Sequence, residues 1–174
     1  MLLVCLAVYS LKMTLALGID PGTATTGYGL VRIEPDGSLI AVNYGVILTP
    51  KDATASARLV MLYDELRDII SKYHPEIAAV EKLFFSKNVT TALAVGQARG
   101  VVMLCLEQAG IEAFEYTPNE VKQAVAGYGS AQKKQVQEMV RALLALESIP
   151  KPDDAADALA IAITHLSTKR YDLM

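Results

Sequence analysis

The order of the predicted strands and helices limits the fold more than any other feature of this sequence. Strands are predicted at 14–19, 27–34 and 39–48 with only short connections between them, including the turn-forming segment EPDGS. Strands joined in this way pair antiparallel. Helical patterns precede the strands predicted at 76–81 and 111–116, and such crossovers join parallel strands. We therefore expect an α/β fold with a central mixed five-stranded sheet flanked by helices.

Helices are predicted where apolar side chains recur at helical spacing. In residues 56–73 one stripe carries Leu59, Leu62, Leu66, Ile69 and Ile70, and His74-Pro75 ends the pattern. The other predicted helices cover 88–109, 118–125 and 131–146, and a last one begins at Asp153.

The length and composition fit one globular domain. Of the residues, 52% are hydrophobic and 20% are charged, which is typical of a folded chain. A chain of 174 residues is too short for two full-sized domains. The net charge of −3 argues mildly against a nucleic-acid partner. Residues 82–141, however, hold seven Lys and Arg against five Asp and Glu, so the acidic excess lies elsewhere.

The first 19 residues resemble a membrane span only in length. Their single charge, Lys12, would lie mid-membrane, and neither a basic segment nor a convincing cleavage site flanks them. We expect no membrane association, a strand that starts near Met13, and an N-terminal extension at 1–12. Cys5 and Cys105 lie in apolar surroundings without metal-ligand spacing, so we expect buried thiols in a reducing cytoplasm.

Carboxylates follow two of the predicted strands and open the last helix. Asp20 and Glu81 each end a strand, and they would be neighbours if both strands lie in the middle of the sheet. In the segment KPDDAADALAIAITH, Asp153 fits the helix N-cap, while Asp154 and Asp157 fall on one face of the first turn. Acids there are ordinary capping residues, but three are more than capping requires.

Such a cluster suits one or two Mg²⁺ ions, because hard cations prefer oxygen ligands. Two ions can activate a water and stabilise the leaving oxygen of a phosphodiester. His165 is expected to be a structural residue near the end of the last helix. The small residues after Asp20, in GTATTGYG, are expected to leave room for a phosphate backbone.

Five stretches together resemble the RuvC family of bacterial Holliday-junction resolvases, within the ribonuclease H-like superfamily. They are GIDPG (18–22), VEKLFFSKN (80–88), GQARG (96–100), VKQAVAGYGSAQKKQV (121–136) and DDAADALAIAITH (153–165). Each is weak alone, and the combination is specific.

The resemblance implies a set of functional residues. The catalytic carboxylates and metal ligands would be Asp20, Glu81, Asp154 and Asp157, with Lys133 as a catalytic lysine. DNA contacts would come from Phe84, Lys87, Lys122, Lys133 and Lys134. Neighbouring residues of an extended segment point opposite ways, so either Phe84 or Phe85 could face DNA.

The resemblance also implies a cofactor and partners. A ribonuclease H-like nuclease domain would cover 13–168, with a short tail at 169–174. It would cut four-way junction DNA in recombination and repair, as a cytoplasmic homodimer, with two Mg²⁺ ions per site and Mn²⁺ as a substitute. Its products would carry 5′-phosphate ends. The long helix after residue 88 would take part in dimerisation, and the branch-migration helicase complex RuvA/RuvB would be a partner.

Three other functions share part of this pattern. ATP-binding folds of the actin, Hsp70 and sugar-kinase kind use a similar GIDxG hairpin, but they need two such domains. A nuclease of ribosomal RNA precursors shares the first carboxylate strand, although GQARG and the last motif favour a resolvase. A non-catalytic DNA-binding module would not need four converging acids.

Overall fold

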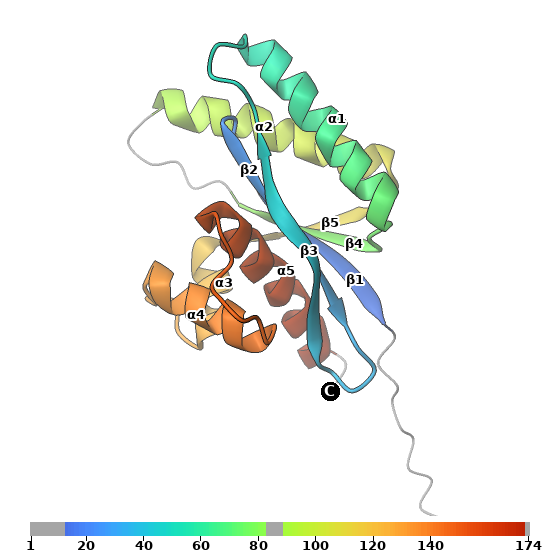
Figure 1. The fold of residues 1–174 in the computed structure, drawn as a ribbon, viewed down its shortest axis with the longest axis vertical. Coiled ribbons are helices and arrows are strands. Elements are labelled where there is room, and N and C mark those ends of the chain that lie inside the picture. The colour runs from blue at the N-terminus through green and yellow to red at the C-terminus, as the bar shows by residue number, and fades with distance from the viewer. Residues whose placement is uncertain (1–12, 83–88, 173–174) are drawn as a thin grey trace, which may run out of the picture.

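A five-stranded mixed sheet forms the centre of the protein in a computed structural model, which describes residues 13–82 and 89–172 (Figure 1). The strand order is β3-β2-β1-β4-β5. The strands are β1 (Thr14–Asp20), β2 (Thr25–Ile33), β3 (Leu39–Leu48), β4 (Ile77–Glu81) and β5 (Glu112–Tyr116).

The strand directions confirm the predicted α/β class and the mixed sheet. β1 and β2 pair antiparallel, as do β2 and β3, while β1 with β4 and β4 with β5 pair parallel. The β2–β3 hairpin turns at Gly37, whose φ of 83° suits glycine and whose N–H donates to the Glu34 carbonyl at 2.9 Å. β1 therefore lies in the middle of the sheet, beside the first parallel strand.

Helices cover both faces of the sheet, as Figure 1 shows. One buried cluster joins one face to α1 and α2, and a second joins the other face to α3, α4 and α5. The helices are α1 (Ala55–Tyr73), α2 (Val89–Gln108), α3 (Pro118–Ala126), α4 (Lys133–Leu143) and α5 (Asp153–Asp172).

Among the helices on its face of the sheet, α5 is the most deeply buried. From Ala155 to Leu166 every residue except Asp157 is buried. A helix that is apolar on all sides must be enclosed, and α5 lies against β1 and β2 beneath α3 and α4. Its N-terminal end therefore has a fixed position relative to the centre of the sheet.

The predicted end of α3 and both predicted ends of α4 differ from the structure, and the residues that flank the helices explain the differences. α3 continues to Ala126 because it ends at Gly127, whose φ of 85° provides a left-handed cap. α4 begins at Lys133 rather than 131, because Gln132 is the N-cap and exchanges hydrogen bonds with Gln135. It also ends earlier than predicted, before Ala145 at φ 50°.

The predictions about membranes and cysteines are tested only in part. In the part of the chain that the structure describes, no helix is long and apolar enough to cross a membrane. Cys105 is buried with a free thiol, as predicted. Cys5 and the extension 1–12 lie outside the described residues.

Candidate active site

The first two carboxylates are neighbours because their strands are parallel. Ile19 of β1 is in register with Val80 of β4, and the next residue of each strand is Asp20 and Glu81. Parallel strands end at the same edge of a sheet, so both acids lie at the carboxyl edge. The predicted adjacency of Asp20 and Glu81 is confirmed.

The N-terminal turns of α5 reach Asp20 because glycines replace side chains on the sheet. Gly27 is the cross-strand partner of Asp20, and a Cβ added to Gly27 would overlap the carbonyl oxygen of Asp154. A Cβ on Gly18 or Gly29 would likewise overlap the α5 backbone. The helix therefore packs directly on the strand backbones, which brings its acids to β1.

This packing corrects one expectation from the sequence. The small residues after Asp20 are expected to leave room for a phosphate backbone. Gly27 and Gly29 contradict this because they are buried under α5, whereas Gly22 and Thr23 are only partly buried and Ala24 is exposed. Their alternation in β2, opposite the alanine-rich last helix, is the sequence signal for a close strand–helix contact.

The four acids form one electrostatic unit. Burial and the nearby charges of Glu81, Asp157 and Asp154 raise the pKa of Asp20 to about 7, although Lys133 opposes them. Burial, followed by the charge of Asp157, also raises the pKa of Glu81. Burial is again the largest cause of the raised pKa of Asp157, against the opposing effect of Lys133. The acids therefore repel one another strongly when all are ionised.

Two lysines complete the same pocket. An opening of about 260 Å³ is lined by Asp20, Glu81 and Asp157 together with Lys122 and Lys133. The Lys133 Nζ lies 2.9 Å from the Asp157 Oδ2. Desolvation lowers the pKa of Lys133, but its hydrogen bond to Asp157 and the surrounding carboxylates outweigh this and raise it. Lys133 thus partly neutralises the acidic cluster.

Asp153 does not have the predicted capping role. It is the first residue of α5, and its Oδ1 accepts from the Lys151 Nζ at 2.9 Å while its Oδ2 lies 3.6 Å from the Lys133 Nζ. An N-cap residue precedes the first helical residue, so Asp153 does not occupy that position, and its two oxygens lie beside lysines instead. Asp157 also lies beyond the first turn, which contains Asp153 and Asp154.

Lys134, a further predicted DNA contact that the structure describes, does not line this pocket. Lys134 lines an open groove on α4 with Tyr128, Gln135 and Met139, and this groove shares no lining residue with the acidic pocket. Phe84, Phe85 and Lys87 lie outside the described residues. His165 is buried on α5, as expected of a structural residue, with its Nδ1 2.8 Å from the Tyr116 hydroxyl.

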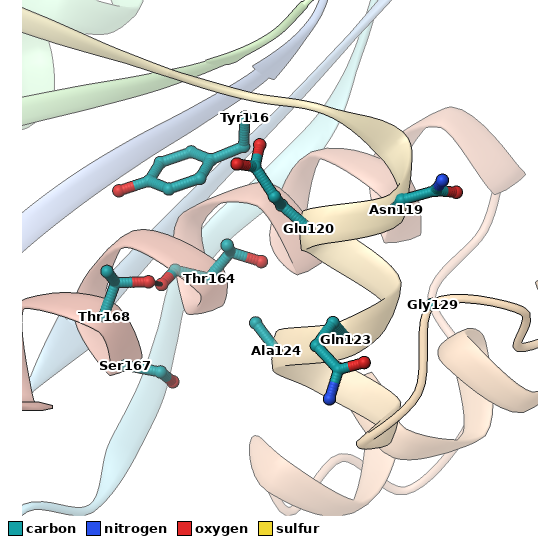
Figure 2. Close-up of a pocket in the computed structure, with 9 residues that line it drawn as sticks. All are labelled: Tyr116, Asn119, Glu120, Gln123, Ala124, Gly129, Thr164, Ser167 and Thr168. Carbon is teal, nitrogen blue, oxygen red and sulfur yellow. Dashed lines mark hydrogen bonds between the residues drawn. The ribbon is translucent and has the colours of Figure 1, made fainter.

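A larger pocket on the same side of the sheet has different chemistry. Its volume is about 690 Å³, and Figure 2 shows hydroxyl and amide side chains of α3 and α5 around it. Its carboxylate, Glu120, accepts from the Thr117 N–H at 2.7 Å as part of a capping box. None of the lining residues in the described part of the chain is basic, so this pocket does not resemble the lysine-flanked acidic one.

The acidic pocket suits a divalent cation because of the chemistry of its side chains, although their positions do not already form a metal-binding arrangement. Within 13–82 and 89–172, no three Asp, Glu, His or Cys side chains are arranged to hold a metal ion. The donors are nevertheless all carboxylate oxygens, which hard cations prefer. Burial and the neighbouring acids raise the pKa of Asp20, so a bound cation would stabilise its ionised form. Asp20, Glu81, Asp154 and Asp157 are the residues that would hold the ion.

The acids make a testable contribution to stability in the absence of metal. The pKa of Asp20 rises from 3.8 to about 7, so the folded chain binds more protons than the unfolded chain between these values. The proton on Asp20 therefore stabilises the folded state. This contribution to the free energy of unfolding is complete below pH 3.8 and is lost as the pH rises through 7. We expect Asp20→Asn to stabilise the metal-free protein at pH 8 by up to about 4 kcal/mol, with a smaller effect at pH 5.5.

Melting temperatures of both proteins, measured in chelator at pH 5.5, 7 and 8.5, would check this. A difference between the two that does not change with pH would contradict the assignment of the raised pKa to Asp20.

The fold and the pocket together define a class. The chain is an α/β protein whose acids and lysines converge at the carboxyl edge of two parallel strands, an arrangement suited to divalent-cation chemistry on phosphates. Residues 16–165 match the family model described as "Crossover junction endodeoxyribonuclease RuvC". The chain therefore belongs to the RuvC family of crossover junction endodeoxyribonucleases, which are divalent-metal-dependent nucleases of recombination and repair.

Individual relatives agree with this assignment. The chain is 59% identical over 152 residues to the RuvC endonuclease of Roseiflexus sp. (strain RS-1), covering 87% of this chain and 90% of that protein. It is 60% identical over 154 residues to the protein of the same name from Chloroflexus aggregans, covering 88% and 93%.

Solved structures agree as well. A Thermus thermophilus RuvC in complex with a Holliday junction substrate matches with a TM-score of 0.83 and 34% identity, over 90% of this chain and 96% of that one. A Fowlpox virus resolvase, 13% identical with a TM-score of 0.59 over 88% and 99%, shares the fold. The predicted family and the ribonuclease H-like fold are confirmed.

Proposed function

We propose that this chain resolves four-way DNA junctions by cutting two like strands symmetrically and leaving 5′-phosphate ends. The observation that carries the proposal is the pocket lined by Asp20, Glu81 and Asp157 with Lys122 and Lys133, beside which the charge of Asp154 also raises the pKa of Asp20. Support also comes from the Thermus thermophilus relative, which was solved with a Holliday junction substrate. One catalytic domain at 13–168 would suffice for each cut.

We propose Mg²⁺ as the cofactor, with two ions per site and Mn²⁺ as a substitute. Asp20, Glu81, Asp154 and Asp157 would hold them, and the ions would supply an activated water and charge stabilisation at the leaving oxygen. Asp20 and Glu81 are placed by strands, and Asp154 and Asp157 by a buried helix, so the protein fixes these carboxylates without relying on loops.

Lys122 and Lys133 would act on the DNA side of the pocket. Both line it, and the charge of each lowers the pKa of Glu81. We propose that they hold the phosphate beside the bond that is cut. Lys134 would contact a more distant phosphate from the outer face of α4, and Phe84 and Lys87 would contact the junction centre.

A homodimer would supply the two active sites that a paired cut needs. Helix α2 leaves Leu93 65% and Leu104 53% exposed, and a Cβ on Gly100 would meet no atom of the described residues within 4 Å. An apolar, open helix face of this kind suits close packing against a second copy. The cytoplasmic branch-migration complex RuvA/RuvB is proposed as a further partner.

Cleavage of a synthetic four-way junction, compared with a linear duplex of the same sequence, tests the proposed function. We expect paired nicks in the junction with Mg²⁺, none with excess chelator, and little cutting of the duplex. Equal cutting of junction and duplex, or cutting that survives the chelator, would contradict it.

A further inference from the structure

Arg58 differs from the other arginines whose side chains the structure describes. Each of the others lies within ion-pair distance of at least one carboxylate: Arg32 with Glu34, Arg67 with Asp64 and Asp68, Arg99 with Glu115, and Arg141 with Glu138. Arg58, in the first turns of α1, makes no ion pair with any described residue. A guanidinium is always charged, so this positive charge remains uncompensated within the described chain.

The side chain of Arg58 is nevertheless held in place. Its Nε donates to the Thr49 Oγ1 at 2.8 Å, and that hydroxyl donates to the Thr23 carbonyl at 2.5 Å. The Thr49 N–H also donates to the Ala24 carbonyl at 3.2 Å. Because Nε is the bonded atom, the two terminal nitrogens are left without a partner among the described residues.

These contacts connect Arg58 to the loop that follows Asp20. Thr23 and Ala24 belong to the β1–β2 connection, which begins directly after Asp20. Figure 1 shows this connection and the N-terminal end of α1 close together at the same end of the sheet. The anchored arginine is therefore tied to the loop that follows the most perturbed carboxylate of the pocket.

The charge lies on the opposite face of the sheet from the lysines. Lys122 and Lys133 come from α3 and α4, which pack on one face, whereas α1 packs on the other. The acidic pocket lies at the edge between them. A DNA strand that crosses four carboxylates is repelled by them, and cations on both sides would hold it across the pocket.

We propose that Arg58 binds a backbone phosphate of the junction DNA, on the side of the cleaved bond away from Lys122 and Lys133. The terminal nitrogens form the fork that matches two phosphate oxygens. The bond to Thr49 restricts the side chain before DNA arrives, which reduces the conformational entropy lost on binding. This inference rests on the proposed function, since it assumes that the acidic pocket acts on DNA.

The test is the salt dependence of junction binding by the full-length protein, measured in chelator so that the DNA stays intact. We expect Arg58→Gln to weaken binding about 3- to 10-fold and to reduce the slope of log affinity against log salt by about 0.9, the value for one duplex phosphate contact. Arg67→Gln is the matched control, because it removes the same charge from the same helix. It should leave the slope unchanged.

Two further variants separate phosphate binding from support of the loop. Thr49→Val breaks the connection to Thr23 but keeps the charge, so the salt slope should stay at the wild-type value. Arg58→Lys restores a charge without the Nε bond, and it should recover most of the slope even if Arg58→Gln folds poorly. The inference would be overturned if the salt slope of Arg58→Gln were no lower than that of Arg67→Gln. It would also be overturned if the salt slope of Arg58→Lys stayed as low as that of Arg58→Gln. Wild-type protein that does not bind junctions would instead contradict the proposed function.

Discussion

Asp20→Asn is expected to abolish junction cleavage while leaving junction binding intact. The charges of Glu81, Asp157 and Asp154 all act on the Asp20 carboxylate, and together with burial they raise its pKa to about 7. An amide at this position removes the charge that a cation needs and keeps the shape. We expect the cleavage rate to fall at least about 1,000-fold, which corresponds to about 4 kcal/mol of transition-state stabilisation.

Single-turnover cleavage and a gel-shift assay in chelator would measure the two effects separately. Asp36→Asn is the control, since Asp36 lies in the exposed β2–β3 turn and binds only Ser38 there. It should cut at the wild-type rate. If Asp20→Asn cut at the wild-type rate, Asp20 could not be a catalytic residue of the proposed site.

Gly27→Ala is expected to damage both stability and cleavage, although it adds only a methyl group. That methyl would overlap the Asp154 carbonyl, so α5 must move away from β2. Overpacking of a buried contact costs about 1 to 3 kcal/mol, and a shift of about 1 Å in catalytic groups can cost about 100-fold in rate. We therefore expect Gly27→Ala to lower both the free energy of unfolding and the cleavage rate by about these amounts.

Thermal melts and cleavage rates would check this prediction. Gly129→Ala is a suitable control, because its added Cβ would lie 3.5 Å from the nearest atom, the Asn119 carbonyl oxygen, at ordinary contact distance. Its melting temperature should stay near that of the wild type. If Gly27→Ala melts and cuts like the wild type, the contact between β2 and α5 does not place Asp154 and Asp157.

The adjacency of Asp20 and Glu81 could be predicted because it depends on local signals. Each acid ends an apolar run, and two hairpins after β1 followed by a helical crossover from β3 to β4 imply that β1 and β4 run parallel. The sequence thus contained both the strand ends and their direction. The acids of α5 were identified as a pair by their spacing, but nothing local showed which strands they would meet.

Contacts between distant segments could not be predicted in the same way. Lys133 of α4 binds Asp157 and Asp153 of α5, and this choice depends on how two helices pack on the sheet. The bond of Arg58 to Thr49 likewise joins α1 to the end of β3. Asp153 was assigned to capping because its neighbours in sequence favoured it, whereas Lys133, 20 residues earlier, is one of its partners in space.

The central claim is that Asp20, Glu81, Asp154 and Asp157 form a single divalent-cation centre. The most direct test is the rise in melting temperature of the wild type on addition of Mn²⁺ or Mg²⁺ at pH 8, compared with Asp20→Asn. A ligand that binds only the folded state stabilises it, and more so the tighter it binds, so we expect a clear rise for the wild type and little or none for the variant. An equal rise in both proteins, or no rise in the wild type, would contradict it.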